Sequence, residues 1–237
     1  MKLFTFLFFC SLNCFCQNAL VKNVDDFVGV DIYENYYYLQ NSALHKSSLN
    51  NDYKNIKYGT PDVVDISNPL QVLLLYKLFN KVISIDNKLN FIAEYQVPFG
   101  TDLIASAGEN KIWTYNNIHK TISVYNLKTQ KIEIRSILIT SKITQLKGDL
   151  NKAIITNTNN QLETYNFVAR KITSTPLKDT QLSISMRNLY VLKNNKLYKE
   201  KSEITNTPKS IVSFEVQNNI FYYFKDNSIY KTFLTQP

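Results

Sequence analysis

Hydrophobic and polar positions alternate over short distances along much of the chain, most clearly between residues 72 and 97. The apolar run VLLLY (72–76) has the length of a strand and is too short for an ordinary helix. After KLFN, the stretch KVISID (81–86) alternates with period two, as the two faces of a strand require. DNKLN is a turn signal, and FIAEYQV (91–97) begins a third strand. The pattern predicts three antiparallel strands joined by short turns, and it argues against a membrane span.

The same unit recurs through the sequence. Its first strands are expected to begin near residues 36, 72, 111, 152, 188 and 219, which gives spacings of 36, 39, 41, 36 and 31 residues. Strand repeats of about 40 residues are typical of β-propeller blades. We therefore predict an all-β fold, a β-propeller of about six blades built from antiparallel meander repeats of roughly 37 residues. The stretch DFVGVDIY (26–33) is expected to be the strand that closes the ring against the last unit.

Asparagine takes the place of glycine in the predicted turns. The chain has only five glycines, and asparagine tolerates the left-handed backbone region better than most other residues. Turns are predicted at pairs that include Asn41-Ser42, Asn159-Asn160, Asn194-Asn195 and Asp226-Asn227. The 16 tyrosines and 14 phenylalanines cluster in the predicted strands. Packing between blades explains them better than a carbohydrate-stacking stripe does.

The first 16 residues have the layout of a secretory signal peptide. Lys2 supplies a positive charge, an apolar run follows, and cleavage is expected before Gln17. Lipidation at Cys14 or Cys16 is the alternative, although Asn13 and Phe15 fit a lipoprotein site poorly. Residues 17–237 are then a single propeller domain. No later segment reaches the length of a membrane span, so we expect the mature chain to be soluble once exported.

The net charge does not indicate nucleic-acid binding. The formal charge is +8, and it falls by one, to +7, when Lys2 leaves with the signal peptide. The lysines lie mostly beside asparagines in predicted turns and do not gather on one element. We expect a solvated basic surface and no nucleic-acid partner.

No combination of residues in the sequence is typical of a catalytic, metal-binding or cofactor-binding site. His45 and His119 both lie beside lysines and are expected in exposed turns, outside any metal-binding spacing. All three cysteines lie within residues 1–16, and no nucleophile elbow or phosphate-binding loop is present. Glu94 and Asp102 flank a predicted strand without a recognisable partner. We therefore predict no catalytic, cofactor-binding or metal-binding residues, no cofactor, and no enzyme activity.

One segment does not follow the repeat. Residues 57–69, KYGTPDVVDISNP, contain two prolines and are expected to form a loop in which a binding function could reside. Asp62, Asp65 and Asn68 are spaced three apart there. They lack the glycine and the terminal glutamate of a calcium-binding loop, so calcium is the weaker interpretation.

The stretch DVVDISNPLQVLLLYKLFNKVISIDNKLN (62–90) resembles a pattern found in exported β-propeller-like proteins of Bacteroidota, D-I-S-N-P, L-L-L-Y and F-x-x-V-x-x-L-D-N-x-L-N. The matching positions are Asp65, Ile66, Ser67, Asn68, Pro69, Leu73 to Tyr76, Phe79, Val82, Asp86, Asn87, Leu89 and Asn90. NKIWTYN (110–116) is similar to a motif that tends to follow it. The resemblance covers roughly 50 residues, and Ile85 stands where leucine is usual. The broad group includes the plug subunit of the type 9 secretion translocon.

The resemblance implies a non-catalytic periplasmic protein-interaction module. Such an accessory subunit would bind and plug the periplasmic end of a large outer-membrane β-barrel, at the inner face of the outer membrane. The alternative is a secreted or periplasmic glycan-binding protein or hydrolase with a pocket at the centre of the propeller. A third possibility is an anchored envelope protein of structural type, which requires lipidation at Cys14 or Cys16.

Overall fold

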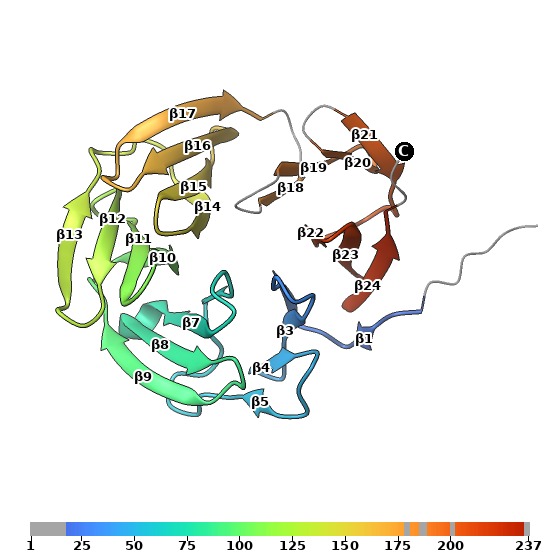
Figure 1. Ribbon diagram of the computed structural model, residues 1–237, viewed down its shortest axis with the longest axis horizontal. Coiled ribbons are helices and arrows are strands. Elements are labelled where there is room, and N and C mark those ends of the chain that lie inside the picture. Colours follow the sequence, from blue (N-terminus) through green and yellow to red (C-terminus); the bar gives the residue numbers. More distant parts are fainter. Residues whose placement is uncertain (1–17, 178–180, 185–188, 200–201, 235–237) are drawn as a thin grey trace, which may run out of the picture.

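The computed structural model describes residues 18–177, 181–184, 189–199 and 202–234. The predicted signal peptide (1–16) lies outside these ranges. Six four-stranded antiparallel sheets form the blades of a ring (Figure 1), which confirms the six-bladed propeller. Blade 1 consists of β2 (Asp26–Val30), β3 (Tyr36–Gln40), β4 (Ala43–Lys46) and β5 (Asp52–Tyr53). Blade 2 consists of β6 (Val63–Asp65), β7 (Gln71–Tyr76), β8 (Lys81–Asp86) and β9 (Phe91–Gln96). Blade 3 consists of β10 (Thr101–Ser106), β11 (Lys111–Asn116), β12 (Thr121–Asn126) and β13 (Lys131–Arg135).

The remaining blades continue the ring. Blade 4 consists of β14 (Ile143–Gly148), β15 (Lys152–Asn157), β16 (Gln161–Asn166) and β17 (Lys171–Pro176). Blade 5 consists of β18 (Gln181–Ile184), β19 (Leu189–Lys193), β20 (Lys196–Lys199) and β21 (Ser202–Asn206). Blade 6 joins β22 (Ser213–Gln217), β23 (Ile220–Lys225) and β24 (Ser228–Phe233) to β1 (Val21–Lys22). No helix in the part of the chain that the structure describes is long and apolar enough to cross a membrane.

The blades begin one strand earlier than the sequence predicts. The strands expected near residues 36, 72, 111, 152, 188 and 219 are each the second strand of a blade. The innermost strands lie before them and line the axis of the ring (Figure 1). Several innermost strands contain a register shift, as between Phe27 and Gly29 or between Thr101 and Leu103. These bulges interrupt the period-two pattern, which is why the sequence does not show the innermost strands clearly.

The ring is closed by β1, and the prediction that residues 26–33 close it is wrong. Val21 and Lys22 pair with Ile229 and Ser228 of β24, so the fourth strand of blade 6 comes from the other end of the chain. Residues 26–30 instead form the innermost strand of blade 1 and pair with β3. The closing strand is only two residues long, too short for a periodic pattern to reveal it.

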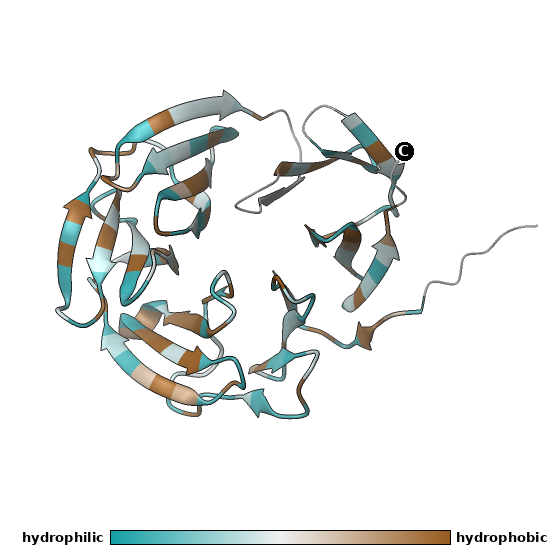
Figure 2. Ribbon diagram, in the orientation of Figure 1, coloured by the Kyte–Doolittle hydropathy of each residue, from teal (hydrophilic) through white to brown (hydrophobic). Residues whose placement is uncertain are grey.

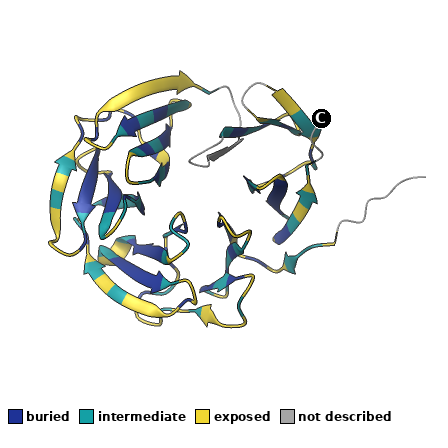
Figure 3. Ribbon diagram, in the orientation of Figure 1, coloured by how far each residue is buried: buried dark blue, intermediate teal, exposed yellow. Residues whose placement is uncertain are grey.

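The apolar run 72–76 is continuous because both faces of β7 are buried between neighbouring blades. Val72, Leu74 and Tyr76 pack in a cluster with blade 1, whereas Leu73 and Leu75 pack in a cluster with blade 3. The residues of β23 divide in the same way between blades 5 and 1. Hydrophobic residues gather in the middle strands of the blades (Figure 2), and the outer strands are more exposed (Figure 3). Many of the aromatic residues, among them Tyr76, Tyr115 and Phe221, therefore pack between blades, as predicted, while others such as Phe99 are exposed.

The predicted role of asparagine in turns is confirmed. Of the 18 non-glycine residues with positive φ among those described, ten are asparagines. Asn194 and Asn195 have φ values of 51° and 58°, and Asp226 and Asn227 have 49° and 51°. Two successive positive φ values are typical of the type I′ turn in tight hairpins.

Candidate functional site

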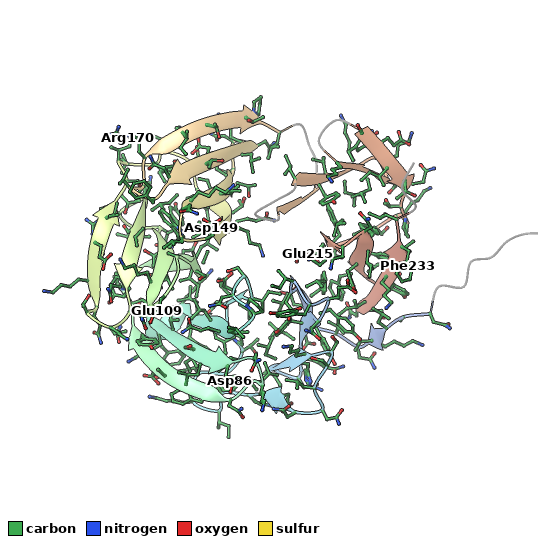
Figure 4. All side chains as sticks on the ribbon, in the orientation of Figure 1. Asp86, Glu109, Asp149, Arg170, Glu215 and Phe233 are labelled. Carbon is green, nitrogen blue, oxygen red and sulfur yellow. The ribbon has the colours of Figure 1, made fainter. Side chains whose placement is uncertain are left out.

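A cavity of about 440 Å³ lies on the axis of the ring. Residues of the innermost strands β2, β6, β10, β14 and β22 line it, with a few from adjoining segments. Its charged lining residues are Asp65 of blade 2, Lys147 of blade 4 and Glu215 of blade 6. Figure 4 shows Glu215 at the inner edge of blade 6. Two carboxylates from different blades therefore reach one cavity, as the pocket alternative requires.

Asp65 is buried, at 3% exposure, and its carboxylate is well supplied with donors. Its Oδ2 atom accepts hydrogen bonds from the Ser106 backbone N–H at 2.8 Å and from the Ser67 hydroxyl at 2.9 Å. Burial raises the pKa of Asp65, while the charge of Lys147 opposes the rise. Because Ser106 ends the innermost strand of blade 3, Asp65 connects blade 2 to blade 3.

Glu215 makes an equivalent connection at the seam of the ring. Its Oε2 atom accepts a hydrogen bond from the Val30 backbone N–H at 3.2 Å, and Val30 ends the innermost strand of blade 1. Burial raises the pKa of Glu215, and the charge of Lys147 again opposes the rise. Gly29 permits this arrangement, because a Cβ at that position would overlap the Glu215 carboxylate. We call Asp65 and Glu215 the channel carboxylates, because both line the cavity on the axis of the ring. Each accepts a hydrogen bond from the backbone of the next blade.

The other acidic residues singled out from the sequence lie away from the cavity. Glu94 forms an ion pair with Lys81 at 3.0 Å and accepts a hydrogen bond from the Tyr58 hydroxyl at 2.9 Å. Asp102 forms an ion pair with Lys77 at 2.8 Å. Neither residue lines the cavity. These interactions supply the partners that the sequence could not identify.

The two histidines differ in environment. His119 is exposed in the turn after β11, as predicted. The prediction for His45 is wrong, because it lies within β4, half-buried, with its ring stacked on Tyr38 at 5.0 Å between centroids. Its Nε2 atom is 3.8 Å from Asp52.

The three polar side chains singled out in residues 57–69 each accept hydrogen bonds in the structure. Asp62 accepts a hydrogen bond from the Lys77 backbone N–H at 2.8 Å, and Asn68 accepts one from the Leu70 backbone N–H at 3.1 Å. Asp65 is bonded to Ser67 and Ser106, so the three side chains have different partners. Within the described ranges, no group of three or more histidine, cysteine or acidic residues could hold a metal ion. The end of the segment is β6, whose residues line the cavity.

A second candidate site lies on one face of the ring. In an antiparallel blade, the loops after the second and fourth strands lie at the same edge, and we call the face that they form the docking face. Five successive loops of this face, 54–62, 77–80, 97–100, 117–120 and 136–142, carry exposed apolar side chains. We call this set the apolar arc; its members are Ile56, Leu78, Phe79, Phe99, Ile118, Ile137 and Leu138.

Local structure holds members of the apolar arc in place. Residues Lys77–Phe79 form a single 3-10 turn that ends at Asn80 in the left-handed region. The Phe79 ring packs on Tyr58, with 4.7 Å between centroids. Ile118 lies over Gly100, where a Cβ would overlap its side chain. The arc is therefore presented by ordered loops.

Sequence reasoning missed the apolar arc because its members come from loops far apart in the chain. A signal was present, however. The turns after the second strands of blades 2 and 3 are KLFN and NIHK, whereas those of blades 4, 5 and 6 are TNN, NN and DN. Glu215 and Lys147 were also missed, because isolated charged residues in a strand carry no motif.

Comparisons with known proteins support the fold. No protein-family model matches the sequence, and no curated protein sequence matches it. The structure is similar to a virginiamycin B lyase from Staphylococcus aureus in complex with quinupristin, with a TM-score of 0.59 and 12% identity over 92% of this chain and 98% of that chain. It is also similar to BBS1N in complex with ARL6DN, with a TM-score of 0.58 and 13% identity over 90% and 79% of the two chains.

A third similar structure is PorZ, an essential bacterial surface component of the type-IX secretion system of Porphyromonas gingivalis. Its TM-score is 0.51 and its identity 10%, over 92% of this chain and 38% of that chain. At such identities, these similarities establish a propeller fold, which occurs in proteins of very different functions.

Proposed function

We propose that the chain is a non-catalytic, periplasmic interaction module that binds and plugs the periplasmic end of a large outer-membrane β-barrel translocon of the type 9 secretion system. The observation that carries this proposal is the apolar arc. Clusters of exposed apolar side chains mark sites of protein or membrane interaction, and here such side chains lie on five successive loops of one face of the ring. The docking face is thus the side that meets the outer membrane.

Three further observations support the proposal. The channel carboxylates Asp65 and Glu215 are engaged by backbone N–H groups of neighbouring blades, which gives them a structural role. The sequence pattern of residues 62–90 resembles that of exported propellers. Among proteins of similar fold, BBS1N is in a complex with a protein and PorZ is a component of the type-IX secretion system.

The test is an affinity pull-down from detergent-solubilised envelopes, with co-eluting proteins identified by mass spectrometry. We expect a large outer-membrane barrel in stoichiometric amount. A protein that elutes alone would overturn the proposal.

The contacting face can be identified by cross-linking. All three cysteines lie within residues 1–16, so the expected mature chain offers a unique thiol after a single substitution. Lys209→Cys places a photoreactive cross-linker in an exposed loop of the docking face, and Lys88→Cys places it in an exposed loop of the opposite face. We expect the barrel adduct from Lys209→Cys alone. An adduct from Lys88→Cys alone would show that the opposite face makes the contact.

A second candidate function is glycan binding or hydrolysis in the central cavity. It is favoured by the convergence of Asp65 and Glu215 from two blades, both with raised pKa values, since raised carboxyl pKa values occur in general acids. The test is calorimetric titration of the protein with cell-wall and polysaccharide fragments. Binding that Glu215→Gln abolishes would establish this function, and the absence of heat with every fragment would reject it.

A further inference from the structure

The apolar arc consists of side chains at the tips of loops. Ile56 is 95% exposed, Leu78 and Ile137 are each 84% exposed, and Phe99 is 76% exposed. The loops follow one another around the ring, from the connection between blades 1 and 2 to the connection between blades 3 and 4. Their apolar tips therefore form a curved row at one edge of the molecule.

The same five loops are strongly basic. They contain five lysines and a single acidic residue, Asp62, whose carboxylate accepts the Lys77 backbone N–H. Four of these lysines are exposed: Lys54, Lys57, Lys120 and Lys142. The fifth, Lys77, is paired with Asp102. A surface that contacts the arc would therefore meet apolar tips and a surplus of positive charge.

The other described loops of the docking face carry fewer exposed apolar side chains. The hairpin turns of blades 4 to 6 on the docking face, residues 158–160, 194–195 and 226–227, are built from asparagine, threonine and aspartate. Exposed apolar residues also occur on the opposite face, but Glu109 and Asp149 lie in loops there, and Asp86 lies at the start of another. Loop 207–212 of the docking face combines one exposed apolar side chain, Val212, with Lys209. Among the residues described, seven apolar side chains and five lysines come together only in the five loops of the arc.

The composition of the arc favours lipid over protein. The cores of protein interfaces are enriched in aromatic residues, including phenylalanine, in methionine and in arginine, and they are depleted in lysine. The loops of the arc contain two exposed phenylalanines, but they otherwise combine isoleucine and leucine with five lysines and no arginine. Lysines interact favourably with anionic headgroups, and apolar side chains beside them enter the boundary between headgroups and acyl chains.

We propose that the apolar arc binds directly to an anionic lipid surface, its apolar tips entering the headgroup region and its lysines contacting lipid phosphates. This proposal rests on the proposed function for its setting. The docking face would then lie parallel to the membrane, so that the arc rests on lipid while the remainder of the face covers the barrel.

The test is co-sedimentation of the purified protein with phosphatidylcholine vesicles that do or do not contain phosphatidylglycerol, without any barrel protein. We expect binding to the anionic vesicles that weakens as salt is added, because headgroup attraction is screened. The affinity of the triple variant Leu78→Ser, Phe99→Ser, Ile137→Ser for the anionic vesicles should be lower by a factor of roughly ten or more, since it removes three apolar side chains from the contact.

The matched control is Leu70→Ser, Leu150→Ser, Phe167→Ser, which removes three comparably exposed apolar side chains from the opposite face. It shares every other feature of the chain, including its N-terminus, and should bind like the unsubstituted protein. Equal losses in both variants, or no sedimentation of the unsubstituted protein, would overturn the proposal.

The two experiments distinguish failure of the lipid-contact proposal from failure of the proposed translocon function. Recovery of the barrel in the pull-down without any vesicle binding would reject lipid contact and leave the proposed function intact. Arc-dependent vesicle binding by a protein that elutes alone in the pull-down would reject the translocon partner and leave lipid contact intact.

Discussion

At the scale of single residues, asparagine makes the tight hairpins of this protein possible with very little glycine. The left-handed conformation costs an L-amino acid roughly 1–2 kcal/mol, and asparagine tolerates it better than most. A few turn positions use less suitable residues, among them Ser42, whose φ is 63°. Replacing residues at such positions with glycine should increase the stability of the fold.

Replacing Ser42 with glycine should therefore stabilise the protein. Removing the left-handed strain outweighs the greater entropy of glycine in the unfolded chain, and we expect a gain of about 0.5 kcal/mol. Denaturant unfolding of Ser42→Gly beside Ser42→Val checks this. The valine variant should lose stability because of its branched Cβ, and a gain on going to valine would contradict the explanation.

The channel carboxylates should give an unusual pH dependence. Burial raises the pKa of Glu215 above its ordinary value of 4.5, so the folded state keeps this proton to a higher pH than the unfolded state. The contribution of Glu215 to stability is thus greatest below pH 4.5 and is lost as the pH rises from there to the raised pKa. Asp65 should add a contribution of the same sign.

Glu215→Gln should remove this loss while keeping an acceptor for the Val30 N–H. Relative to the unsubstituted protein, the variant should become more stable as the pH rises above about 4.5. Urea unfolding from about pH 4 to 8 measures the difference. A difference in the free energy of unfolding that stays constant across this range would show that the pKa of Glu215 is not raised by folding.

At the scale of elements, the middle strands were the predictable part of each blade. Strands such as β7, β8 and β23 are flanked by clear turn signals and are rich in buried apolar residues. Apart from β2, which lies within the predicted strand 26–33, the innermost strands were missed because bulges and channel-facing polar residues break their pattern, as at Asp65. The sequence could predict the channel only as the axis of a ring, because the pairing of blades decides which charges meet there.

The short strand β1 should be important for stability despite its two-residue length. Beside it, Val24 is 1% exposed, and the backbone N–H groups of Leu20 and Val24 donate to Ile229 and Asn227. A chain that begins at residue 26 loses these contacts, and the burial of Val24 alone is worth about 1.5–3 kcal/mol.

Thermal unfolding should therefore show a lower Tm for a chain beginning at residue 26 than for one beginning at residue 18. Limited proteolysis should also cut the shorter chain within β24. Equal Tm values for the two chains would mean that β1 does not close the ring in solution.

At the scale of the whole molecule, each blade relies on its neighbours. The apolar clusters lie between blades, with residues of two adjacent sheets in each. Loss of blade 1, 2, 3 or 6 would expose apolar surface on both sides of the gap. We therefore expect a ring that unfolds as a unit, unlike an open array in which terminal repeats unfold separately.

Trp113 provides the measurement. It is the single tryptophan of the chain, it is fully buried, and its Nε1 atom donates to the Asp149 carbonyl of blade 4 at 2.8 Å. Its fluorescence reports on the contact between blades 3 and 4, whereas circular dichroism reports on all strands. The two signals should change at the same denaturant concentration. Separate midpoints would show that parts of the ring unfold independently.

The pairing of β1 with β24 also fixes an order of events in time. A chain that emerges from a ribosome or an export channel with its N-terminus first exposes Val21 long before Ile229, its partner, is present. Blade 6 cannot form until nearly the whole chain has emerged, and the ring stays open until then. The pairing thus keeps the ring open until almost the whole chain is available, which is compatible with the proposed export of the chain in an unfolded state.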